Sequence, residues 1–310
     1  MMNAQSRRFL LCAGALLSAW MFTAGAHAQS AAKPAAPTPT KGGTLAVALN
    51  PEPPFLLGAI NPTLQMGVVT SKVMEGLLSY DLNLNPQPLL AESWSKSADG
   101  LSYTFKLRKG VKWHDGKPFT SADVAFSLMN VWKPLHPRGR STFSKVTSVE
   151  TPDAHTVVFK LSGVTPQLLS ALSSYESQVV PKHLFNGKEV ATNPLVNAPV
   201  GTGPFVFKEW KKGNYILLER NPDYWQAGKP YLDKIVYRII TDASSRAAAL
   251  ESGEVQLAGL SPVPLNDVAR LAEVPTLGVE TKGYEYMSPV YMIEFNLRKG
   301  PLADARVRQA

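Results

Sequence analysis

Cysteine is almost absent from this chain of 310 residues, and the single one, Cys12, lies close to the N-terminus. If the first 28 residues are removed, as argued below, 282 residues remain and none of them is cysteine. This excludes a scaffold held by disulfides and a zinc site built from thiolates. The fold must instead be stabilised by burial of apolar side chains, for which the chain is long enough.

Catalytic motifs are also scarce. The sequence has no His-Glu-x-x-His motif and no Gly-x-Ser-x-Gly nucleophile elbow. Ser93 and Lys96 match the Ser-x-x-Lys motif of penicillin-binding enzymes, but the companion Ser-Asp-Asn and Lys-Thr-Gly motifs are missing. In Gly201-Thr202-Gly203-Pro204 the proline disfavours the helix start that a phosphate-binding loop requires. We therefore expect a protein that is not an enzyme and needs no cofactor.

The beginning of the chain has the pattern of a secretory signal peptide. Arg7 and Arg8 precede an apolar run, and Ala26-His27-Ala28 offers a cleavage site before Gln29. A membrane anchor fits less well because Gly, Ser and Thr interrupt the run and no stop-transfer charges follow it. Cys12 has no lipobox context. We expect cleavage after Ala28, export by the Sec or twin-arginine route, and a disordered Ala/Pro/Thr-rich leader over residues 29–41.

The charge of the chain argues against nucleic acid as a partner. The formal net charge of +8 falls to +6 without the signal peptide, and the basic residues are spread along the chain. A nucleic-acid-binding protein would present them as a patch or stripe. A composition of 45% hydrophobic and 18% charged residues is typical of a globular protein instead.

Strand-like and helix-like segments alternate irregularly, which predicts a mixed α/β fold. Residues 103–107 and 157–161 alternate apolar and polar side chains, as half-buried strands do. The denser runs "NYILLER" and "IVYRII" predict strands buried on both faces. Helical spacing predicts helices in residues 62–80, in "DASSRAAALESGE", which ends at Gly253, and in "PLNDVARLAE".

The stretch "GVKWHDGKPFTSADVAFSL" places His114 beside Asp115 and raises the question of a chemical site. Asp115-Gly116 is a turn signal, and Thr120 with Asp123 resembles a capping box for a helix with Val124, Leu128, Met129 and Trp132 on one face. The remaining histidines, at 136, 155 and 183, stand alone in the sequence. We therefore interpret the stretch as a structural turn followed by a helix.

Three long segments resemble the family 5 solute-binding proteins of ABC importers, the dipeptide- and oligopeptide-binding group. They are Val73–Leu128, which contains "VMEGLLSYDLNLNPQPLLAESW" and "KWHDGKPFTSADVAFSL"; Pro199–Trp225, "PVGTGPFVFKEWKKGNYILLERNPDYW"; and Phe295–Ala310, "FNLRKGPLADARVRQA". They occur in the right order and cover most of the mature chain, so the resemblance is specific.

The resemblance implies a periplasmic-binding-protein type II-like fold with two α/β lobes and an extra inserted domain. It places the first lobe at residues 42–72 and 199–282, the insert at 73–198, and the start of the second lobe at 283–310. It also implies a monomeric periplasmic receptor that captures small peptides by hinge closure and delivers them to an inner-membrane ABC permease. Because relatives continue beyond the "DARVRQA" segment, we expect that the second lobe is mostly missing here.

The resemblance and the aromatic residues together suggest ligand contacts. Phe55 follows "PEPP" after the first predicted strand, although packing in the core or at the rim is the alternative. Tyr284, Tyr286 and Met287 lie at the predicted crossover to the second lobe, and Tyr175 lies in "SSYESQ". Gly201–Pro204 is interpreted as a tight turn before a strand, with shaping of the cleft or hinge left open.

Other ligands and one other class of protein remain as alternatives. Members of the same family bind nickel, haem, opines or oligosaccharides, and His136 and His183 are the histidines to examine for a metal or haem. A secreted hydrolase is the remote alternative. No metal site is expected from the sequence.

Overall fold

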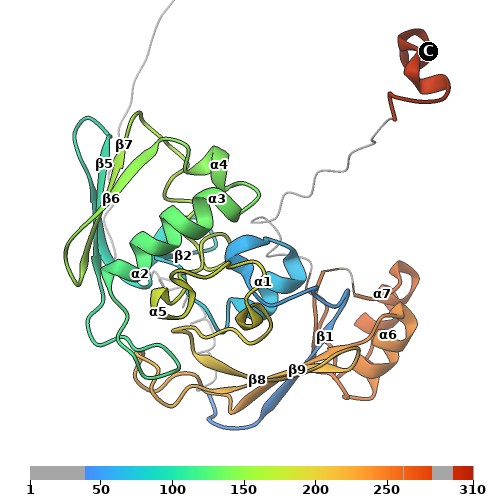
Figure 1. Ribbon diagram of the computed structural model, residues 1–310. Helices are drawn as coiled ribbons and strands as arrows, with labels where there is room; N and C mark the ends of the chain where they lie inside the picture. Colours follow the sequence, from blue (N-terminus) through green and yellow to red (C-terminus); the bar gives the residue numbers. More distant parts are fainter. Residues whose placement is uncertain (1–38, 261, 281–295, 310) are drawn as a thin grey trace, which may run out of the picture. The chain divides into compact units, whose positions relative to one another are not determined.

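The computed structural model describes residues 39–260, 262–280 and 296–309, and its helices and strands form a mixed α/β structure (Figure 1). The predicted signal peptide lies outside these ranges, and so do Tyr284, Tyr286 and Met287. Within the described ranges, no helix has the length and apolar character needed to cross a membrane.

A five-stranded sheet joins a strand near the start of the described chain to strands from residues 205–258. Its strands lie in the order β11, β1, β10, β9, β8, with β1 parallel to both β10 and β11 and the other pairs antiparallel. The bounds are β1 Thr44–Leu49, β8 Phe205–Lys211, β9 Tyr215–Arg220, β10 Lys234–Ile239 and β11 Leu257–Ala258.

The prediction that β9 and β10 are buried on both faces is wrong. Ile216 and Leu218 of β9 are fully buried, whereas Leu217 between them is half-buried. In β10, Ile235 and Tyr237 are buried and Val236 is only half-buried. One face of this sheet packs into the core, and the other face stays partly accessible to solvent. The strands therefore carry more apolar residues than the buried face alone needs.

A four-stranded antiparallel sheet is built from the middle of the chain. Its order is β4, β5, β7, β6, with bounds β4 Ala91–Lys96, β5 Ser102–Leu107, β6 Val146–Asp153 and β7 Thr156–Leu161. The alternation predicted for β5 and β7 is confirmed, since Tyr103, Phe105 and Leu107 are buried, as are the inward residues of β7. Helix α2, Ser121–Phe126, packs against β6 and β7 (Figure 1).

The predicted turn and helix start at residues 115–123 are confirmed. Gly116 has φ = +84°, and Asp123 accepts a hydrogen bond from the Thr120 backbone N–H at 2.8 Å in a capping box. The chain continues as a π-helix over Ser127–Trp132 and as α3, Lys133–Leu135. Met129 is therefore exposed rather than on the buried face, because the wider π-turn shifts side chains away from helical spacing.

The helix predicted over residues 62–80 is wrong in its second half. Helix α1 covers only Leu64–Thr70, and Leu78–Tyr80 is strand β2, paired with β3, Pro86–Pro88. Residues 73–77 of the segment between them are all buried, so their mainly apolar character reflects burial and not an amphipathic helix. Their backbone carbonyls accept hydrogen bonds from Gly203, Val179 and Ala91, so other segments replace the helical hydrogen bonds.

The remaining helices are short. Helices α6 and α7 confirm the two predicted helices, and Asp242 caps α6 by accepting a hydrogen bond from the Ser245 N–H at 2.7 Å. Their bounds and those of the others are α4 Gly139–Thr142, α5 Lys182–Phe185, α6 Ala243–Glu251, α7 Leu265–Ala272 and α8 Ala305–Gln309, with 3-10 turns at Gly58–Ile60, Pro194–Asn197 and Pro301–Ala303.

Candidate ligand-binding site

A cavity of about 350 Å³ lies between one face of the five-stranded sheet and helix α1. The parallel pairing of β1 and β10 sets Leu45 opposite Ile235 and Val47 opposite Tyr237, so that these four side chains form one wall. The complete lining comprises Leu45, Val47, Leu64, Gly67, Val68, Ser71, Lys72, Tyr175, Ile235, Tyr237 and Leu257. Such a largely apolar hollow with a few polar groups is typical of a site for a small solute.

Two tyrosines fix α1 and its surroundings at this cavity. The Tyr237 hydroxyl donates to the Val68 carbonyl at 3.0 Å, and burial raises the pKa of Tyr237. The Tyr175 hydroxyl donates to the Pro62 carbonyl at 2.6 Å, just before α1. A Cβ on Gly67 would lie 2.4 Å from the Tyr175 ring, so the glycine is what lets the ring approach the helix.

The structure places Tyr175 in the cavity wall and Phe55 outside it. Phe55 is partly buried and packs against the main hydrophobic core, as the packing alternative holds. Tyr284, Tyr286 and Met287 lie outside the described residues, so these three ligand contacts stay predictions. The two candidates that can be placed are therefore not brought together in one wall.

Lys72 is the charged group of the cavity. It follows α1, and its ammonium group has no side-chain hydrogen bond or ion pair within the described part of the chain. Lys72 as a residue is exposed to solvent, and desolvation by the protein around it lowers its pKa. A cation without a protein counter-charge at an apolar cavity favours a ligand that carries a carboxylate.

Directly behind α1, the buried carboxylate of Glu75 joins three segments of the chain. It accepts hydrogen bonds from the Thr202 hydroxyl at 2.9 Å, the Tyr224 hydroxyl at 2.8 Å and the Trp225 indole N–H at 3.0 Å. Arg108 stacks over the Trp225 ring, 4.4 Å from its centroid. Glu75 is only 3% exposed, so the group is a structural centre that holds together the segments around residues 75, 202 and 224–225.

The protonation of Glu75 is unusual. Burial raises its pKa to about 7, since the low-dielectric interior disfavours the charged form. The three donors and the charge of Arg108 oppose this shift but do not cancel it. Sequence reasoning missed this centre. The available signal was one acidic residue in the apolar run "VMEGLL", together with Thr202 and Tyr224-Trp225 in the segment Pro199–Trp225 that resembles the family.

The Gly201–Pro204 segment is a tight turn that feeds β8, as predicted. A Cβ on Gly201 would lie 1.8 Å from the Val73 carbonyl oxygen, and the Gly203 N–H donates to that oxygen at 2.9 Å. The glycines are thus required for close approach to the backbone beside Glu75. Whether the turn also shapes a ligand cleft or hinge stays a prediction.

His114 holds this turn in place. Its Nδ1 accepts from the Gly201 N–H at 3.3 Å, while its Nε2 lies 3.0 Å from the Gly203 carbonyl oxygen to which it donates. The interpretation of the stretch around His114 as structural is therefore supported by its contacts. The fold brings His183, which stands alone in the sequence, to Asp115: its Nε2 lies 2.6 Å from Asp115 Oδ2, and this hydrogen bond lowers the pKa of Asp115 against the effect of burial.

Replacing His114 with glutamine should weaken the fold more at pH 7.5 than at pH 5. Burial lowers the pKa of His114, so between its ordinary and its lowered pKa the unfolded chain takes up a proton that the folded chain does not. Wild-type stability therefore falls as the pH drops below about 6.5, and this contribution is lost in the variant. We expect a loss of about 2 kcal/mol at pH 7.5 in urea unfolding, from two hydrogen bonds. His155→Gln is the control, and an equal loss at both pH values would contradict the assignment.

The other candidate chemical residues do not converge on the cavity. His136 is buried with its Nε2 3.7 Å from Glu176, and burial lowers its pKa to about 4. In the ranges that the structure describes, no three His, Cys, Asp or Glu side chains are grouped so as to hold a metal ion. Ser93 and Lys96 are three residues apart in strand β4 and so point to opposite faces, which rules out a Ser–Lys pair.

The cavity between the five-stranded sheet and helix α1 is of the kind that holds a small solute. The model of the bacterial extracellular solute-binding proteins, family 5 Middle, matches residues 85–310, and the chain belongs to this family. The predicted family is thereby confirmed.

Relatives and solved structures agree with this assignment. The oligopeptide-binding protein AppA of Bacillus subtilis is 34% identical over 288 residues, which are 91% of this chain and 51% of AppA. The structure of AppA in complex with a nonapeptide matches with a TM-score of 0.70 over 77% of this chain and 47% of that one. The predicted fold, that of the two-lobed periplasmic binding proteins, is confirmed.

Two further solved structures carry other solutes. AgaA of A. tumefaciens R10, in complex with agropinic acid, is 37% identical with a TM-score of 0.67, over 75% of this chain and 46% of AgaA. NikZ of Campylobacter jejuni, in complex with Ni(L-His), is 29% identical with the same TM-score, over 75% of this chain and 45% of NikZ. The chain spans about half the length of the curated relatives that it matches.

Proposed function

We propose that this protein is the periplasmic solute-binding receptor of an ABC importer that captures di- or oligopeptides and delivers them to an inner-membrane permease. The observation that carries the proposal is the 34% identity to AppA over 91% of this chain, together with the match to the structure of AppA bound to a nonapeptide. In this role the protein binds reversibly, and closure on the ligand is stabilised by contacts that exist only in the closed state.

The proposed division into lobes follows the sheets. All strands of the five-stranded sheet come from residues 44–49 and 205–258, within the proposed first lobe of residues 42–72 and 199–282. The whole four-stranded sheet comes from residues 91–161, within the proposed insert of residues 73–198. In this proposal the second lobe begins near residue 283, and the ligand binds at the cavity beside α1.

The proposed receptor is located in the periplasm and is a monomer. Signal cleavage after Ala28 releases a monomer into the periplasm, by the Sec or the twin-arginine route. Phe55, Tyr175, Tyr284, Tyr286 and Met287 remain the proposed ligand contacts, and the protein catalyses no reaction. Of these residues, Tyr175 has the strongest support, because it lines the cavity with α1 and β10.

The first test is native mass spectrometry of the protein isolated from the periplasm of its source. Peptide adducts of varied mass that leave on denaturation are the expected result. A single adduct with the mass of a small acid would favour the kind of solute held by AgaA, and nickel would favour the kind held by NikZ. Protein without any adduct, and without peptide binding in a titration, would overturn the proposal.

Replacing Lys72 with glutamine should weaken binding of peptides that end in a free carboxylate. We expect the dissociation constant of Ala-Leu-Ala to rise about fivefold, which corresponds to about 1 kcal/mol for a partly exposed charge pair. The amidated peptide should lose nothing, since it has no charge to pair with the ammonium. Isothermal titration measures both, and Lys188→Gln is the matched surface control. An equal effect on acid and amide would show that Lys72 does not contact the carboxylate.

A further inference from the structure

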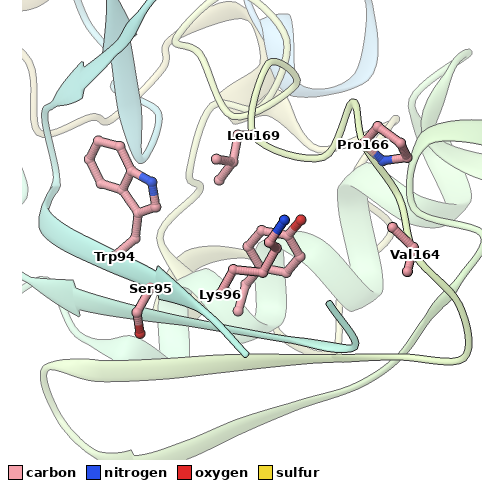
Figure 2. Close-up of a pocket in the computed structure, with 7 residues that line it drawn as sticks. Trp94, Ser95, Lys96, Val164, Pro166 and Leu169 are labelled. Atoms are coloured by element: carbon pink, nitrogen blue, oxygen red, sulfur yellow. The ribbon is translucent and has the colours of Figure 1, made fainter. Parts of the chain in front are cut away.

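A second cavity, of about 420 Å³, lies at the edge of the four-stranded sheet, away from the residues that line the first one. Trp94 and Lys96 of the edge strand β4 face Val164, Pro166 and Leu169 across it, and these three residues belong to the segment after β7 (Figure 2). Ser95 of β4 and Tyr103 of β5 complete the lining. The walls are mainly apolar, and Val164 is 50% exposed.

The backbone of β4 is open beside this cavity. Among the residues that the structure describes, β4 pairs only with β5, along residues 93–96, and the Ser97 N–H donates to the Ser102 carbonyl at 2.9 Å. Because residues of an antiparallel pair alternate between facing the partner and facing away, Ser93, Ser95 and Ser97 bond to β5. The N–H and C=O groups of Trp94 and Lys96 therefore point outward, and in the described part of the chain they have no hydrogen-bond partner.

The same two residues thus present both backbone and side-chain contacts. Trp94 and Lys96 are two residues apart, so their side chains share one face and both line the cavity. Trp94 offers an apolar wall together with Leu169, whereas the Lys96 ammonium is exposed and has no ion pair among the residues described. An open edge of this kind pairs readily with an added strand.

We propose that the edge of β4 binds an extended segment of a partner protein as an additional strand. The segment places a large apolar side chain in the cavity beside Trp94 and Leu169, and an acidic residue two positions away pairs with Lys96. The two-residue spacing follows from the alternation of side chains in a strand. The carboxylate follows from the unpaired ammonium, and the apolar residue follows from the cavity walls. This site is independent of the proposed solute cavity.

The test uses the blocked probe Ac-Thr-Val-Thr-Leu-Thr-Glu-Thr-NH₂, labelled with fluorescein, and the full chain. Fluorescence anisotropy should show binding that Lys96→Glu weakens about fivefold or more, since attraction becomes repulsion. A probe with Lys in place of Glu should bind the Lys96→Glu variant more tightly than it binds the wild-type protein. Lys188→Glu is the control and should change nothing. A probe with Leu and Glu three positions apart should bind more weakly, because those side chains lie on opposite faces.

Hydrogen exchange locates the bound probe. Protection of the Trp94 and Lys96 amides is expected, and Lys72→Gln should leave probe binding unchanged. Protection at α1 instead, or loss of binding in Lys72→Gln, would assign the probe to the solute cavity and overturn the proposal. Three other results would also overturn the proposal. They are the absence of binding up to about 1 mM probe, an unchanged affinity of the probe for Lys96→Glu, and self-association of the protein through β4 that excludes the probe. Failure here would leave the receptor proposal untouched.

Discussion

Replacement of Glu75 by alanine is expected to lower the free energy of unfolding by about 3–5 kcal/mol. The change removes the acceptor of one buried donor, on Thr202, and of two partly buried donors, on Tyr224 and Trp225, and leaves a cavity in place of the Glu75 side chain. Each donor that stays away from water without a partner destabilises the fold by its desolvation free energy, because no hydrogen bond compensates for the lost contact with water. Urea unfolding followed by tryptophan fluorescence measures the loss, and the Trp225 environment should change in the native baseline as well.

The matched variant Glu75→Gln keeps the shape and one carbonyl oxygen, so it should be the more stable of the two variants by about 2 kcal/mol. It also isolates the titration of Glu75. The folded chain holds this proton up to about pH 7, whereas an unfolded glutamate releases it near its ordinary pKa of 4.5. Lowering the pH from 7 to 4.5 should therefore stabilise the wild type relative to Glu75→Gln by roughly 3 kcal/mol.

Two outcomes would contradict this account of Glu75. Equal stabilities of the alanine and glutamine variants would show that the three donors find other partners. A stability difference between wild type and Glu75→Gln that does not change between pH 4.5 and 7 would show that the carboxyl group titrates at its ordinary pKa.

Replacement of Gly201 by alanine should be almost as damaging, at about 3 kcal/mol or more. The new Cβ would lie 1.8 Å from the Val73 carbonyl oxygen and 2.5 Å from its carbon. Backbone atoms cannot rotate away as a side chain can, so the turn must lift off the segment that carries Glu75. The His114 contacts to Gly201 and Gly203 would then be lost together with the Thr202 hydrogen bond. Thermal unfolding of the variant measures the loss.

Gly259→Ala is the control for this substitution, because a Cβ at Gly259 meets no atom within 4 Å and its φ is not in the left-handed region. It should change the free energy of unfolding by less than about 0.5 kcal/mol. Equal effects of the two substitutions would mean that the Gly201 turn is not docked on residues 72–74.

Local rules were sufficient where a single segment determines its own structure. The alternation in β5 and β7, the turn at Gly116, the capping box at Thr120 and the Asp242 cap all depend on neighbouring residues, and all were predicted. The rules failed where distant segments decide. The buried run after α1 looks helical, but it makes its hydrogen bonds with residues as far away as Gly203.

Local sequence rules could not predict the candidate site either, because distant segments of the chain form it. Its walls come from α1, from β1 and from β10, and the cavity exists only because the parallel register brings Val47 beside Tyr237. Tyr175 was suggested as an aromatic residue in a polar run, whereas nothing in its sequence context predicted the contact with Gly67. Lys72 was missed because a lysine within a predicted helix is ordinarily a surface residue, and Lys72 is indeed exposed; only the folded arrangement places it at the cavity.

The pairing of the sheets also determines the order in which this chain assembles. The four-stranded sheet forms from one stretch, with contacts between β5 and β7 about 50 residues apart, such as the hydrogen bond from Lys106 to Thr156. The five-stranded sheet must instead join β1 to residues 190 positions later, as in the hydrogen bond from Gly43 to Asp233. Pairing between strands far apart in the sequence is slow, and β1 stays unpaired until β10 has been synthesised. A chaperone that binds the emerging chain would accordingly meet residues 44–49 as an apolar segment that stays unpaired until residues 234–239 have emerged.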